Sequence, residues 1–172
     1  MRKRRVIAVV TAVVGVFAAI VTTSVAANAA QGGYFEFVNS ISGKCADLRL
    51  GSTAPYTLLE QWDCHNTDKQ LWQPISLGNG YLKYVNKASG LCMNVRGSQA
   101  ATGTLVDQED CDASRPGQWW RWLGADEIGH LVLNSGVGNY CLALQGVYSA
   151  RNGWTIVINE CATTSGQMWH PA

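Results

Sequence analysis

The sequence lacks the short motifs that mark the common catalytic classes. It has no serine nucleophile elbow, no zinc signature and no glycine-rich phosphate loop. Beyond the N-terminal region, no segment carries a convincing helical period, and no apolar stretch is long enough to span a bilayer. These absences weigh against an enzyme, and they leave short strands as the expected source of structure.

The sequence also lacks a Cys-x-x-Cys pair, a spacing typical of zinc ligands. Only Cys64 and His65 place a cysteine beside a histidine. We therefore expect the six cysteines to form disulfides rather than to hold a metal ion, and we expect no cofactor.

A basic surface is missing once the N-terminal segment is set aside. Residues 2–5 are basic, residues 6 to about 25 are apolar, and residues 27–29 (Ala-Asn-Ala) fit a cleavage signal. This order predicts a secretory signal peptide over residues 1–30, with an uncleaved membrane anchor as the alternative. The segment holds four of the 13 Lys and Arg residues and none of the 12 acids, so residues 31–172 carry a net charge of −3. That charge disfavours nucleic acid and anionic membranes as partners. The length of the remaining chain predicts one secreted domain, which we expect to be a monomer.

What the sequence does contain is a threefold internal repeat. A Gln-x-Trp pattern at residues 70–72 returns 48 residues later and again after another 49. The cysteines fall into pairs separated by 19, 19 and 20 residues, and an asparagine stands six or seven residues before each pair: Asn39, Asn86 and Asn134. These matched spacings divide the chain into repeats of about residues 34–80, 81–130 and 131–172.

The repeat also selects one disulfide connectivity among those that six cysteines allow. Each unit closes its own pair, which predicts the bonds Cys45–Cys64, Cys92–Cys111 and Cys141–Cys161.

Strands are expected throughout. Residues 81–85 and 155–158 are short runs rich in β-branched and aromatic side chains, and they are bounded by turn signals at residues 78–80, 89–90 and 152–153. Three copies of a unit of nearly 50 residues can close on one another, so that each buries its tryptophan against the other two.

At these residues the chain resembles the ricin B-type lectin family. The resemblance rests on the three Gln-x-Trp motifs, on Cys-Ala-Asp-Leu at residues 45–48 and on Gln-Trp-Asp-Cys at residues 61–64. It implies an all-β fold, a β-trefoil of twelve short strands in three pseudo-symmetric repeats. In that fold we interpret Trp72, Trp120 and Trp169 as core residues, and the glutamines of the three motifs as partners for buried backbone groups.

The resemblance also implies a carbohydrate site in the first repeat. In the family, an acid two residues after the first cysteine accepts hydrogen bonds from sugar hydroxyls, and an aromatic ring two residues before the second cysteine stacks on the sugar. Asp47 and Trp62 occupy these positions. His65 resembles the Cys-His of bacterial xylan-binding modules, and Asn66 and Gln70 add amides.

The first repeat departs from the pattern at two positions. Glu60 stands where many members have Gln, and Lys69 stands where galactose-binding members often have Asn. Both side chains can bond hydroxyl groups, but they weaken the case for galactose.

The other two repeats depart further, so we expect one competent site. Asn94 and Glu109 stand at the acid and ring positions of the second repeat, and Ala143 and Asn159 stand there in the third. Three aromatic residues near the third repeat's positions match no family pattern: Tyr140, Tyr148 and Trp154.

Three functions follow from this sequence. The first is a secreted, non-catalytic protein that binds galactosyl or xylosyl groups of glycans. The second is a protein-binding trefoil, an inhibitor or toxin component, whose sugar sites are vestigial. The third is a small glycosidase, which needs two carboxylates across a bond. The adjacent acids at residues 109–110 and 126–127 would point to opposite faces of a strand, so the third function is the weakest.

Overall fold

The computed structural model describes residues 32–124, 131–146, 150–162 and 164–172. The predicted signal peptide, Asp126, Glu127 and Tyr148 lie outside these residues. Within the described ranges, no helix is long and apolar enough to cross a membrane.

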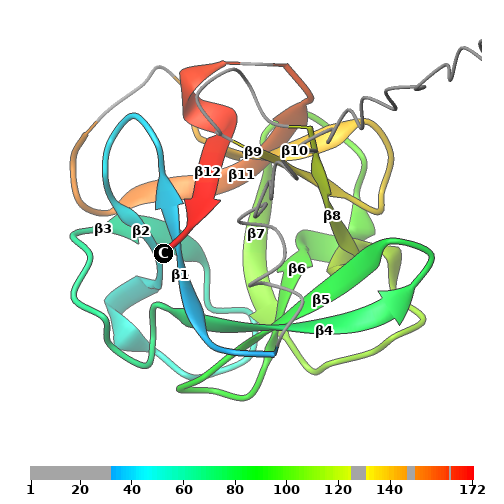
Figure 1. Cartoon of the computed structure of the whole chain (residues 1–172), viewed down its shortest axis with the longest axis horizontal. Helices are drawn as coiled ribbons and strands as arrows, with labels where there is room; N and C mark the ends of the chain where they lie inside the picture. The colour runs from blue at the N-terminus through cyan, green and yellow to red at the C-terminus, as the bar shows by residue number, and fades with distance from the viewer. Residues whose placement is uncertain (1–31, 125–130, 147–149, 163) are drawn as a thin grey trace, which may run out of the picture.

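The described residues form twelve strands, four from each repeat (Figure 1). The first repeat forms β1 (Phe35–Asn39), β2 (Cys45–Leu48), β3 (Leu59–Trp62) and β4 (Leu71–Gly78). The second forms β5 (Tyr81–Asn86), β6 (Cys92–Val95), β7 (Thr104–Glu109) and β8 (Trp120–Leu123). The third forms β9 (Leu131–Ser135), β10 (Tyr140–Leu144), β11 (Trp154–Glu160) and β12 (Met168–Pro171).

Six of the strands close into a barrel. β1 pairs with β4, β4 with β5, β5 with β8, β8 with β9, β9 with β12, and β12 with β1, all antiparallel. The last pairing joins the two ends of the described chain, with Phe37 opposite Pro171 and Asn39 opposite Trp169. Each repeat therefore gives its first and last strand to the barrel, which is the arrangement expected of a β-trefoil.

The remaining six strands form three hairpins, β2–β3, β6–β7 and β10–β11. They are joined to one another because β11 pairs with both β3 and β7, and Leu58 bridges to Asp107. The three repeats occupy three sectors around the centre of Figure 1. The predicted trefoil of twelve short strands is confirmed.

The predicted core is confirmed as well. Trp72, Trp120 and Trp169 are fully buried in one cluster of apolar side chains. Each indole donates its N–H to a backbone carbonyl two positions before the end of the second strand of its own repeat, at Ala46, Met93 and Leu142. In all three repeats, the buried indole N–H therefore has a hydrogen-bond partner at the equivalent backbone position.

The repeated asparagines hold the turn after the first strand of each repeat. Asn39 accepts hydrogen bonds from the backbone N–H groups of residues 41 and 42, and Asn86 accepts them from residues 88 and 89. The Nδ2 groups of Asn39, Asn86 and Asn134 donate to backbone carbonyls. These buried asparagines therefore belong to the fold rather than to a ligand site.

The three disulfides join the predicted cysteines, and no described cysteine is free. The strands expected around residues 81–85 and 155–158 are present as β5 and β11. Four single turns of 3-10 helix were not predicted: Arg49–Gly51, Arg96–Ser98, Pro116–Gln118 and Ser165–Gln167. A three-residue turn is too short to leave a helical period in the sequence.

Candidate functional site

The β2–β3 hairpin places the two principal predicted residues on one face. Cys45 lies opposite Trp62, and Asp47 lies opposite Glu60. Because directly opposed residues point to the same side of a sheet and every second residue shares a face, all four side chains lie together. The Cys45–Cys64 disulfide then fixes the loop that follows Trp62.

Asp47 is the buried acceptor of this face, with 1% of its surface exposed. Its Oδ2 accepts a hydrogen bond of 2.7 Å from Nε2 of Gln70 and lies 3.3 Å from Nζ of Lys69. Its Oδ1 has no hydrogen-bond partner among the described residues. A buried carboxylate oxygen without a partner is unfavourable, and a ligand hydroxyl could supply the missing bond only if the groups that cover this atom shift.

Burial raises the pKa of the Asp47 carboxyl above its usual value of 3.8. Lys69 and Gln70 act in the opposite direction, and the nearby Glu60 adds a small further rise. Asp47 is therefore less readily ionised than an exposed aspartate, because removing a charge from water costs free energy.

Gln70 is fully engaged inside the protein. Its Nε2 donates both to Asp47 and to the backbone carbonyl of Asp63, and its Oε1 accepts from the backbone N–H of His65. Gln118 and Gln167 make the same two backbone contacts in their repeats. Only the bond to Asp47 is particular to the first repeat, and both amide hydrogens of Gln70 are used.

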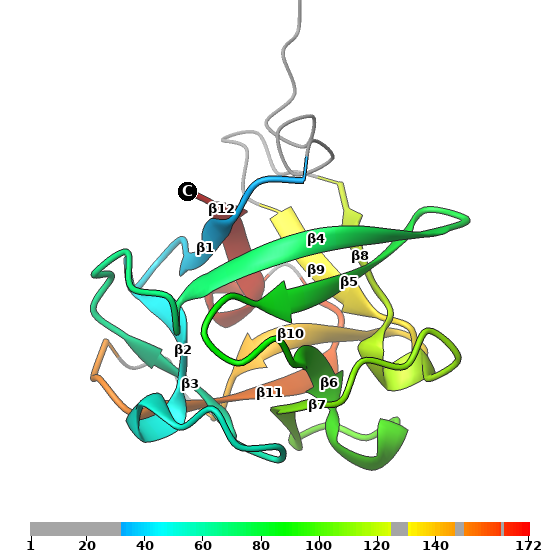
Figure 2. The same ribbon diagram turned by 90° about the horizontal axis from the view of Figure 1, so that it is seen from below.

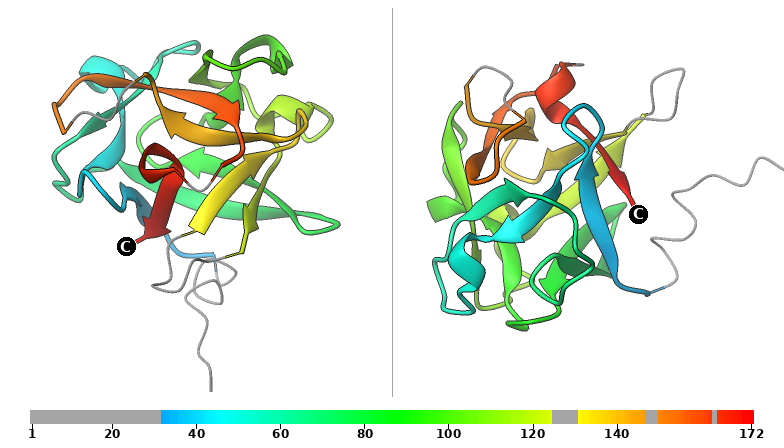
Figure 3. Two further views of the ribbon diagram at one scale, coloured as in Figure 1. Left: turned by 90° about the horizontal axis from the view of Figure 1, so that it is seen from above. Right: turned by 90° about the vertical axis from the view of Figure 1, so that its left-hand side faces the viewer.

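Trp62 is half-buried, and a loop of the third repeat lies against it. The backbone N–H of Gly153 donates to the carbonyl of Gln61, and a Cβ at Gly153 would lie 3.9 Å from Cζ3 of Trp62. Nδ2 of Asn152 donates to Asp63 at 2.8 Å. Figures 2 and 3 show the start of β11 beside β3 of the first repeat, in keeping with the pairing of these two strands.

His65 and Asn66 lie exposed on the loop after the disulfide. The loop is held by its backbone, since the N–H of Asn66 donates to Oε1 of Glu36 at 2.8 Å and Asn66 itself has a positive φ of 51°.

Glu60 is held by the neighbouring strands. Its Oε2 accepts a 2.9 Å hydrogen bond from Nε of Arg49, whose Nη2 donates to the hydroxyl of Thr155 on β11. The two opposed carboxylates are thus each paired with a cation, Glu60 with Arg49 and Asp47 with Lys69.

Comparison with known proteins matches this chain to two sequence models. The ricin-type beta-trefoil lectin domain matches residues 78–172, and the ricin-type beta-trefoil lectin domain-like family matches residues 24–109. The chain belongs to the ricin-type beta-trefoil lectin family. A comparison with curated proteins finds no significant match.

Solved structures share the fold of this lectin domain. The designed threefold-symmetric protein ThreeFoil is 25% identical with a TM-score of 0.76, over 81% of this chain and 97% of that one. An exo-beta-1,3-galactanase from Clostridium thermocellum is 24% identical with a TM-score of 0.75, over 81% of this chain and 30% of the enzyme. The Macrolepiota procera ricin B-like lectin, solved with lactose, is 18% identical with a TM-score of 0.66, over 81% and 94%.

In the second repeat of the lectin domain, the side chains at the acid and ring positions are bonded to other side chains of the same repeat. Nδ2 of Asn94 donates to Asp107 at 2.9 Å, and Arg96 bonds the other oxygen of that acid. Glu109, at the ring position, pairs with Arg115. A hollow of about 240 Å³ remains here, but no ring lines it. The acids at residues 109–110 include this paired Glu109, so they form no free catalytic pair.

The third repeat uses its positions in the fold. Ala143 lies buried on β10, and Oδ1 of Asn159 accepts a hydrogen bond from the backbone N–H of Gly103. Tyr140 and Trp154 pack against the core, and the Trp154 indole donates to the carbonyl of Gln145. Both rings are only partly exposed.

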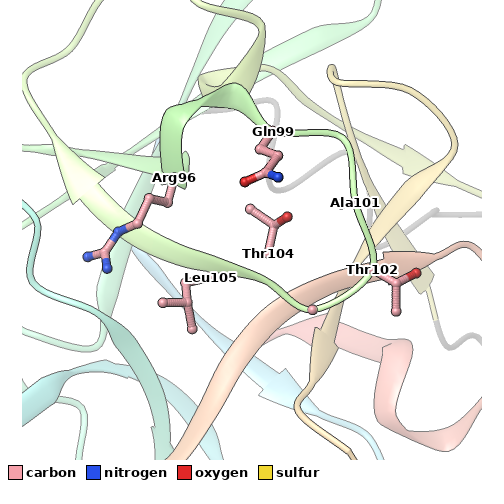
Figure 4. Close-up of a pocket in the computed structure, with 7 residues that line it drawn as sticks. Arg96, Gln99, Ala101, Thr102, Thr104 and Leu105 are labelled. Atoms are coloured by element: carbon pink, nitrogen blue, oxygen red, sulfur yellow. The ribbon is translucent and has the colours of Figure 1, made fainter.

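Another hollow of about 320 Å³ lies under the loop between β6 and β7 (Figure 4). Gln99 and Thr104 point into it, whereas Arg96 points away and is held by Asp107 and the carbonyl of Tyr56. No aromatic ring lines this hollow, so it lacks the stacking surface of a sugar site.

The sequence interpretation missed the contribution of the third repeat to the first-repeat face. In the sequence, Asn152 and Gly153 indicate only a turn. Their contact with Trp62 and Asp63 arises from the pairing of β11 with β3, and no local pattern encodes that pairing.

Proposed function

We propose that this chain is a secreted, non-catalytic carbohydrate-binding protein that holds galactosyl or xylosyl groups of glycans at the first repeat. Residues 1–30 would be the signal peptide, and residues 31–172 the lectin domain. Family membership supports carbohydrate binding, and the three disulfides fit an extracellular protein.

One observation supports placing the proposed sugar site in the first repeat. Asp47 offers a buried carboxylate oxygen without a partner on the same face as the half-buried ring of Trp62. A sugar hydroxyl would supply the missing hydrogen bond while the C–H face of the sugar covers the ring. The acid and ring positions of the other two repeats are already bonded within the protein or carry no polar group.

The remaining predicted residues take different parts. Gln70 is a positioning residue, since it orients Asp47 and donates no N–H to a ligand. His65 and Asn66 are exposed on the loop that follows Trp62, where they would meet a second sugar unit of a glycan. Lys69 is an additional donor beside Asp47, within reach of the same hydroxyls.

A glycan array probed with the oxidised chain tests the proposal. We expect binding to glycans with terminal or backbone galactosyl or xylosyl groups, and a loss of the signal in Trp62→Ala. Tyr56→Ala is the matched control, because it removes an aromatic ring that is 64% exposed and lies outside this face. Absence of binding to every glycan would overturn the proposal and favour a protein-binding trefoil.

A further inference from the structure

A second aromatic surface lies in the second repeat, away from the family positions. The β4–β5 hairpin projects from the body of the molecule, as Figures 2 and 3 show. Between this hairpin and the chain before β8 lies a hollow of about 120 Å³, lined by Leu77, Gly78, Asn79, Tyr81, Ala113 and Trp119. We call it the aromatic hollow.

The two aromatic rings of the aromatic hollow, Tyr81 and Trp119, lie side by side with their planes tilted against each other. The centroids of Tyr81 and Trp119 are 5.8 Å apart, and their planes are inclined at 48°. Both rings are partly exposed. Two inclined rings offer adjoining apolar faces that a flat ligand can cover.

Both rings are held before any ligand arrives. The Trp119 indole donates to the carbonyl of Ala113 at 2.9 Å, and a Cβ at Gly136 would lie only 2.6 Å from Cβ of Trp119, so a glycine backbone packs against this residue. The guanidinium of Arg121 lies 5.3 Å from the centroid of Tyr81. A surface that is already ordered loses little conformational entropy on binding.

The polar group of the aromatic hollow is the amide of Asn79. It stands exposed at the tip of the hairpin with a positive φ of 52°, and its side chain makes no hydrogen bond with the described residues. No acid lines the hollow, and Arg121, which lies over the Tyr81 ring, is bonded to Asn134. The chemistry is therefore that of a neutral ligand with an apolar face and hydroxyl groups.

Size decides between a sugar and a protein as the occupant. Six residues line the hollow, whereas a specific protein interface takes roughly 20–30 residues a side. One pyranose ring matches a platform of two rings and one amide.

We propose that the aromatic hollow is a second carbohydrate subsite, which takes one pyranosyl unit of a glycan chain through Tyr81, Trp119 and Asn79. It is separate from the first-repeat site and uses no acid. A glycan long enough to reach both surfaces gains avidity, since the second contact becomes intramolecular.

Titrations with xylohexaose and galactohexaose, followed by NMR of the indole N–H groups, separate the two sites. Trp62 reports the first-repeat site, and Trp119 reports the aromatic hollow. We expect the Trp119 resonance to shift with one of these sugars in the wild-type chain and also in Asp47→Asn. Asn79→Gly should weaken the Trp119 response about tenfold, the loss expected for one hydrogen bond. Glycine accepts the positive φ, so this variant should melt like the wild type.

Each outcome distinguishes the two proposals. A Trp119 shift without a Trp62 shift would sustain the aromatic hollow and refute the first-repeat site. A Trp62 shift without a Trp119 shift, or no shift at all, would overturn the aromatic hollow. A Trp119 resonance that moves with protein concentration in the absence of sugar would show self-association instead. Tyr56→Ala is again the control, and it should leave both responses unchanged.

Discussion

Replacing Asp47 by asparagine should weaken glycan binding and stabilise the protein at the same time. The variant keeps the size of the side chain, but it can place an N–H where the carboxylate oxygen without a partner now stands. A hydrogen bond to a charged group is worth about 1.5–3 kcal/mol, which corresponds to a loss of roughly 10- to 150-fold in affinity. Calorimetric titration with the oligosaccharide that binds best would measure the loss.

The gain in stability follows from the raised pKa of Asp47. For an acid whose pKa is higher in the folded state, the ionised form destabilises the fold above that pKa, and the penalty disappears as the pH falls toward the unfolded value. Asp47→Asn should therefore melt at a higher temperature than the wild type at pH 7, and the difference should shrink as the pH approaches 3.8. Unchanged affinity, or a lower melting temperature at pH 7, would refute the reasoning.

Three further predictions concern the core, the charge of the site and a glycine contact. Trp120→Ala should destabilise the fold by about 3–5 kcal/mol, since the ring is fully buried, and thermal melts should show a much smaller loss for Trp62→Ala. Retention on an insoluble polysaccharide should fall on acidification at a pH above 3.8, because the raised pKa of Asp47 removes the carboxylate early; a midpoint below that value would exclude Asp47 as the acceptor. Gly136→Ala should lower the melting temperature, because its Cβ would lie 2.6 Å from the Pro116 carbonyl oxygen; an unchanged melt would show that this contact relaxes freely.

The fold was predictable because the residues that recur in the three repeats make the same contacts in each repeat. Each motif tryptophan donates to a carbonyl of its own repeat, and each motif glutamine bonds the backbone of its own loop. Such contacts connect positions at fixed separations in the sequence, so the spacing alone reveals them. The disulfide pairing follows from the same regularity.

The candidate site was predictable only in part. The sequence places Asp47 and Trp62 in one hairpin, and the observed register brings them to one face. The sequence does not reveal that both amide hydrogens of Gln70 are donated to groups within the protein. Nor does it reveal that Gly153 lies close to the Trp62 ring. The Gln70 bonds lie within the first repeat and depend on the folded course of its own loop. The contact of Gly153 depends on how the third repeat meets the first through the pairing of β11 with β3, which no local pattern encodes.

The closure of the barrel by β1 and β12 has a consequence for folding kinetics. Val38 pairs with His170, so the first and last described strands must find each other across nearly the whole domain. Contacts between residues so distant in sequence slow folding, because the entropy of closing the loop is lost before the contact forms. Until β12 docks, β1 and β9 present open edges that can pair with other chains. The barrel therefore cannot close before β12 has docked against β1 and β9, and these edges stay open to other chains until then.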